Sequence, residues 1–68
     1  MTRSIFSTVR TTLSARKDGQ SETGRLIVRR EDDLNQHGRE GYTLTHTFTI
    51  TTPETITIID TLQKTIED

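Results

Sequence analysis

Residues 42–50 read YTLTHTFTI, which is the clearest structural signal in the chain. Threonine stands at every odd position from 43 to 49, and larger side chains stand at the even positions. Strict alternation with a period of two is typical of a β-strand with one buried face. The sequence therefore predicts a strand whose buried side carries Tyr42, Leu44, His46, Phe48 and Ile50.

A turn is expected directly after this strand, over residues 51–54, because Pro53 has no N–H to give to a β-ladder. A second alternation follows, with four aliphatic residues in phase: Ile56, Ile58, Leu62 and Ile66. The two stretches form a predicted hairpin. The register that pairs Leu44 with Leu62 keeps apolar side chains on one face and places His46 opposite Asp60. Residues 60–67 also fit helical spacing, and this alternative stays open for the tail.

The chain before this hairpin predicts one more strand and one helix. Residues 4–15 alternate with Ile5, Val9 and Leu13 on one face. Residues 17–24 are polar with two glycines and predict a loop, while residues 25–29 fit either a short buried strand or the approach to a helix. Residues 31–37 predict a short helix, since acidic residues open it and Gly38 follows it. The predicted fold is α+β: a small antiparallel sheet of three to four strands with one short helix packed on it, in a single domain over residues 1–68.

The segment LNQHGREGYTL, residues 34–44, adds a resemblance. It is similar to the pattern LNxxGxEG[WY]xL of a family of small bacterial and phage domains called domain of unknown function 4177. The residues that match are Leu34, Asn35, Gly38, Glu40, Gly41, Tyr42 and Leu44. The resemblance implies one helix against a small antiparallel sheet, with the motif joining the end of the helix to a strand. Arg30 and Glu31 depart from the apolar residues usual there. The family implies no activity, because its function is not established.

Composition narrows the function classes. The chain has 68 residues, of which 28% are hydrophobic, so its core must be small. It contains no cysteine and only two histidines, which excludes disulfides and thiolate zinc sites. We therefore expect self-association to stabilise the small core. No apolar run exceeds three residues, so we expect a cytoplasmic protein without a membrane span or signal segment. Glycine-rich phosphate loops, HExxH and GxSxG are missing, which predicts a non-enzyme with no cofactor and no metal.

The charges divide the chain into opposite halves. Residues 1–30 carry seven basic and two acidic groups, whereas residues 31–68 carry two basic and eight acidic groups. The halves either neutralise each other or offer a basic surface to an anionic partner. The candidate binding residues are four arginines and the expected cross-strand pair: Arg10, Arg25, Arg29, Arg30, His46 and Asp60. The pair is interpreted as either an acid–base constellation or a hydrogen-bonded pair at the edge of the core.

The threonine rows suggest a contact between sheets. Thr57 and Thr61 flank Ile59 on the second strand of the hairpin, beside the threonines of the first strand. Such a face is either a favourable exposed surface or half of a sheet-to-sheet dimer contact with Ile59 as its apolar anchor. The leading prediction is a non-enzymatic binding or adaptor module, a homo-oligomer that engages a protein partner or an anionic small molecule; one version is a phage counter-defence protein. The alternative is a nucleic-acid-binding regulator that uses the basic N-terminal half.

Overall fold

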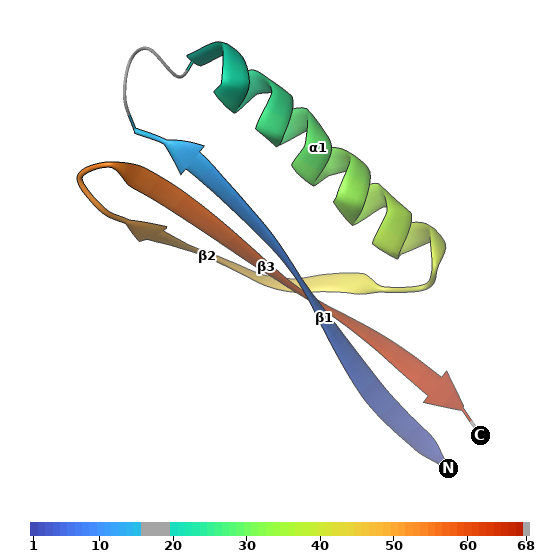
Figure 1. The fold of residues 1–68 in the computed structure, drawn as a ribbon. Coiled ribbons are helices and arrows are strands. Elements are labelled where there is room, and N and C mark those ends of the chain that lie inside the picture. The colour runs from blue at the N-terminus through green and yellow to red at the C-terminus, as the bar shows by residue number, and fades with distance from the viewer. Residues whose placement is uncertain (16–19, 68) are drawn as a thin grey trace.

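The computed structural model describes residues 1–15 and 20–67 and shows one antiparallel sheet with one helix against it (Figure 1). The elements are β1 (Thr2–Ser14), α1 (Gln20–Arg39), β2 (Thr43–Thr51) and β3 (Thr55–Glu67). Three strands pair in the order β1-β3-β2, so the last strand lies in the middle. The helix packs mainly on β1 and only slightly on β2. The predicted α+β fold is confirmed.

The strand predictions hold for β1 and for the hairpin. Val9 and Leu13 of β1 are buried together with Leu62 of β3, and these three residues are the buried apolar core of the described chain. The alternation expected over residues 4–15 is therefore confirmed. β3 remains a strand to Glu67, so the helical alternative for the tail is wrong. The turn at Pro53 is closed by Thr52, whose N–H donates to the carbonyl oxygen of Thr55 at 2.8 Å.

The helix is longer than the sequence predicted. It spans 20 residues and begins at Gln20, so residues 20–24, expected in a loop, and residues 25–29, left open, are helical; residues 17–19 of that loop lie outside the described residues. The least exposed positions of α1 recur at helical spacing: Thr23, Leu26, Arg30, Leu34 and His37. Only two of these are aliphatic, so the helical period is hidden from a search for apolar residues.

The glycine that caps the helix is Gly41 and not Gly38. Gly38 lies inside α1, whereas Gly41 has a φ of 94°, a left-handed conformation that glycine adopts without strain. The N–H of Tyr42 donates to the carbonyl oxygen of His37 at 3.0 Å, and the N–H of Gly41 donates to that of Gly38 at 3.0 Å. These two bonds make a Schellman cap, which directs the chain into β2.

A β-bulge in β2 overturns the predicted hairpin register. Leu44 faces Leu62 as expected, but Thr45 is passed over, so that His46 faces Thr61 and the next residue faces Asp60. One extra residue turns every following side chain to the opposite face of the sheet. The expected pair of His46 and Asp60 is therefore wrong. The expected buried face of β2 is wrong too, because all nine of its residues are exposed.

The chain is extended for its size. Its Cα radius of gyration is 14.4 Å, whereas a compact domain of this length has about 11 Å. Its accessible surface is 5191 Å², whereas a compact monomer of this mass exposes about 4,400 Å². The reason is visible in Figure 1: among the described residues, a long twisted sheet carries a helix on one face and no helix or strand on the other. The described part of a single chain therefore covers only one face of its sheet.

Candidate functional site

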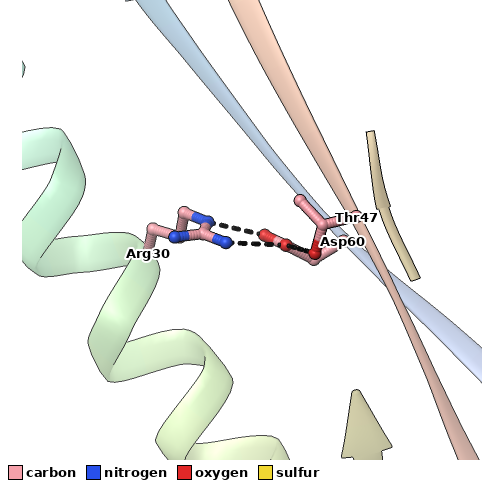
Figure 2. Close-up of polar contacts among 3 residues, drawn as sticks. All are labelled: Arg30, Thr47 and Asp60. Carbon is pink, nitrogen blue, oxygen red and sulfur yellow. Dashed lines mark hydrogen bonds and ion pairs between the residues drawn. The ribbon is translucent and has the colours of Figure 1, made fainter. Parts of the chain in front are cut away.

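An ion pair occupies the centre of the sheet face that α1 covers (Figure 2). Asp60, on the central strand, has no exposed surface. Arg30 of α1 donates from Nε to Oδ2 and from Nη2 to Oδ1 of Asp60, both at 2.8 Å. The hydroxyl of Thr47 on β2 donates to the same Oδ1 at 2.7 Å. The cluster thus joins the helix, the central strand and the edge strand.

The electrostatics of this cluster are those of a satisfied structural pair. The hydrogen bonds from Arg30 hold the pKa of Asp60 below its ordinary value, with further help from Thr47, although burial acts in the opposite direction. The bond to Asp60 raises the pKa of Arg30. The Arg30 side chain is 26% exposed, so part of it reaches solvent. Two of the predicted binding residues therefore bind each other, in a bidentate geometry that favours the charged forms.

A second polar contact joins α1 to the sheet and was not anticipated from the sequence. Ser7 of β1 lies 3.0 Å from Nε2 of His37, and Nδ1 of His37 lies 2.8 Å from the carbonyl oxygen of Asp33. The carbonyl can only accept, so Nδ1 carries a proton, and in the neutral ring Nε2 accepts from the serine hydroxyl. The ring of Tyr42 meets His37 edge to face at 5.4 Å. Because 30 residues separate the serine from the histidine, no local pattern announces the pair.

The geometry of Ser7 and His37 resembles that of a nucleophile and its base. Catalysis would also require space for a substrate and donors for a developing negative charge. Three open grooves in the described part of the chain are lined by other residues. What the contact does in the structure is to join the C-terminal half of the helix to β1.

The face of the sheet away from α1 is called the open face here. Residues directly opposite each other on paired strands share a face, and Asp60 points to the helix, so the neighbouring row points away. That row consists of Arg10, Ile59 and Phe48. Every second row to either side of it belongs to the same face. The open face thus includes Phe6, Thr8, Arg10 and Thr12 of β1, Thr57, Ile59, Thr61 and Gln63 of β3, and His46, Phe48 and Ile50 of β2.

Large apolar side chains are exposed on the open face. Phe6 is 65% exposed, Phe48 43% and Ile50 49%, while Ile59 is half-buried between the edge strands. The rings of His46 and Phe48 lie 5.9 Å apart. Because of the bulge, the face that carries Ile59 and its flanking threonines also carries His46 and Phe48 of β2. Clusters of this kind mark interaction surfaces more often than solvated ones.

The four candidate arginines do not gather on one surface. Arg10 lies on the open face, and Arg30 is held by Asp60. Arg25 and Arg29 line an open groove of about 580 Å³ along α1, together with Glu22, Asp32 and Asp33. The three carboxylates of the groove outnumber its two arginines. The structure therefore places the four candidate arginines in three separate environments.

Searches beyond the chain itself found no relatives. No protein-family model, no curated protein and no solved structure matches this chain. The similarity of residues 34–44 to the domain of unknown function 4177 family stays a prediction. In the described part of the chain, no helix has the length and apolar character needed to cross a membrane. No group of three or more histidine, aspartate or glutamate side chains lies close enough there to hold a metal ion.

Proposed function

We propose that the protein is a non-enzymatic binding module that acts as a homo-oligomer and engages a protein partner. The observation that carries the proposal is the surplus of exposed surface: the chain exposes about 800 Å² more than a compact monomer of its mass. A buried core of Val9, Leu13 and Leu62 is also small for an independent domain, which usually needs reinforcement by a staple or a partner.

A protein partner is favoured over a free anion for the outer side of α1. The groove there mixes two arginines with acidic residues and with Val28. A small anion is bound best where donors converge without nearby carboxylates, whereas mixed charges around apolar atoms are typical of protein interfaces. The same mixture weakens the nucleic-acid alternative, since a polyanion needs several unopposed cations on one surface.

Native mass spectrometry of the purified protein tests the oligomer. We expect an oligomer without retained small molecules, and a monomer at every concentration would contradict the proposal. A labelled oligonucleotide then tests the alternative by fluorescence anisotropy at low and high salt. Tight binding that falls steeply with salt, and that the double variant Arg25→Ala with Arg29→Ala abolishes, would replace the protein-binding proposal with nucleic-acid binding.

A further inference from the structure

We infer that the open face packs against the open face of a second copy, so that two three-stranded sheets form a sandwich with both helices outside. This inference rests on the homo-oligomer proposed above and names the surface that joins the copies. It also gives Phe48, Ile50 and Ile59 a role that the single chain does not supply.

The composition of the open face suits sheet-on-sheet packing. Across its centre, Ile59 lies between Arg10 and Phe48; the next row on one side ends in Ile50 and the next row on the other side ends in His46. Threonines fill the remaining positions of these rows and offer methyl groups. Aligned sheets pack about 10 Å apart through such β-branched and aromatic side chains. The open face therefore resembles one inner face of a sandwich more than a solvated surface.

The area available matches what a stable dimer needs. The Cα extents of the chain are 50 × 21 × 10 Å, so the whole chain is a long, thin slab. A specific interface buries about 800 Å² on each partner. The surface that this chain exposes beyond a compact monomer of its mass is about the same. Covering the open face once would bring the exposed surface of each subunit close to that of an ordinary compact domain.

Charge and availability favour a second copy over another occupant. Within the described residues, the open face carries one cation, Arg10, and one carboxylate, Glu67 at its far end. A nearly neutral face meets its own copy without strong repulsion, as an interface with two-fold symmetry requires. The small core also needs cover whenever the chain is folded, and a second copy is present wherever the chain is present. Arg10 can keep its charged end at the rim while its stem covers apolar surface.

Two single-cysteine variants test the inference, since the natural chain contains no cysteine. Thr8→Cys lies on the open face, opposite Thr61, and Thr49→Cys lies on the helix side of the sheet, opposite Ile58; both native threonines are exposed in the single chain. A thiol reacts only where reagent reaches it, so in the oligomer we expect alkylation at position 8 to be about tenfold slower than at position 49. Dilution to monomer should remove the difference.

A charge substitution supplies an independent readout. Phe48→Glu should make the protein monomeric by analytical ultracentrifugation at concentrations where the natural chain is oligomeric. Val28→Glu is the matched control, because Val28 is 57% exposed on α1 and lies outside the open face. The cysteine pair still decides the question if Phe48→Glu fails to fold.

The outcomes separate this inference from the proposed function. An oligomer in which position 8 reacts freely while position 49 is protected joins through the edge of β2, and it overturns the inference while the homo-oligomer stands. An oligomer that Val28→Glu dissociates joins through the helix and overturns it as well. A natural chain that is monomeric throughout contradicts both proposals.

Discussion

The two faces of the sheet carry different side chains at their centres. The face under α1 holds a charged pair, Arg30 and Asp60, at its centre, whereas the uncovered face displays Phe48, Ile50 and Ile59. Buried charges are rare unless paired, and large exposed apolar clusters are uncommon on monomers. The comparison teaches that polar contacts orient the helix on the covered face, whereas the exposed apolar side chains of the other face suit the second copy that we infer.

The largest expected effect comes from breaking the ion pair on the covered face. Asp60→Asn keeps the shape of the side chain but leaves Arg30 without its counter-ion. Removing one partner of a buried pair costs about 3 kcal/mol or more, which is most of the stability that a small core supplies. Urea unfolding followed by circular dichroism should show a chain that is largely unfolded without denaturant.

The control for this variant is Asp32→Asn, on the exposed side of α1. It removes the same charge without breaking a described ion pair and should unfold like the natural chain. If both variants unfold at the same urea concentration as the natural chain, the ion pair contributes nothing and the comparison between the faces fails.

Acid should reproduce the loss reversibly. Folding lowers the pKa of Asp60, mainly through the hydrogen bonds from Arg30, so the folded chain binds this proton less tightly than the unfolded chain. The stabilisation is therefore complete above about pH 5 and is lost as the pH falls through about 4 toward the folded value. The circular dichroism signal of the natural chain should therefore fall between about pH 6 and pH 3, whereas Asp60→Asn should give a low signal throughout. A natural chain that keeps its full signal and its urea midpoint at about pH 3 would show that Asp60 does not contribute.

On the open face, the effect should depend on protein concentration. Phe48→Thr removes an aromatic ring that the single chain leaves 43% exposed. We expect about 2 kcal/mol of lost stability per subunit at concentrations where the natural chain is oligomeric, and much less at high dilution. Val9→Thr, on the covered face, should destabilise the chain equally at every concentration. Thermal melts over a hundredfold dilution range, about 1 to 100 μM, would check this, and equal concentration dependence in both variants would contradict it.

A smaller effect is expected where β2 meets the ion pair. Thr47→Val keeps the shape of the side chain and removes the hydroxyl that donates to Asp60 at 2.7 Å. A hydrogen bond to a charged group contributes about 1.5 kcal/mol, so the urea midpoint should fall by a matching amount. Thr47→Ser retains the hydroxyl and should recover most of the stability. A serine variant as unstable as the valine variant would indicate that packing, not the hydrogen bond, matters here.

The smallest effect should come from deleting Thr45. Because this residue is the extra one of the bulge, its removal leaves His46 opposite Thr61 and Thr47 opposite Asp60. The lost contact is the bond from its hydroxyl to the carbonyl oxygen of Thr61 at 3.1 Å, worth about 1 kcal/mol. Heteronuclear NMR spectra should show a retained fold. Collapse of the fold on this deletion would mean that the strand pairs without a bulge.

The sequence predicted the sheet better than it predicted the contacts across it. The alternation in β1 and β3 is strong enough to identify both strands, and Leu44 was correctly placed opposite Leu62. The bulge was hidden because threonine fits either face of a strand, so nothing in the pattern marks Thr45 as extra. Asp60 was recognised as an interruption of an apolar stripe, but its partner was misassigned.

The true partner of Asp60 lies outside any pattern that the hairpin offers. Arg30 comes from the helix, 30 residues earlier in the chain. It was chosen as a binding candidate for its charge, and the structure shows that a carboxylate of the same chain already satisfies that charge. Contacts between distant elements depend on how the helix crosses the sheet, which alternation and spacing do not encode. The sequence did predict an outer face with Thr57, Ile59 and Thr61, but it placed Phe48 and Ile50 on the opposite face, because the bulge could not be foreseen.

The strand order also constrains the order in which the strands can pair during folding. β1 is made first, yet its only partner is β3, the last strand to be made, and Thr2 ends up beside Glu67. The hairpin of β2 and β3 can close locally, whereas β1 must wait for a loop of nearly the whole chain to close around it. Until then the inner edge of β3 is unpaired and accepts a β1 strand from any copy nearby. We therefore expect copies to exchange their β1 strands when many chains are synthesised close together. When synthesis is slow and the chains are dilute, each chain should reach the arrangement in Figure 1.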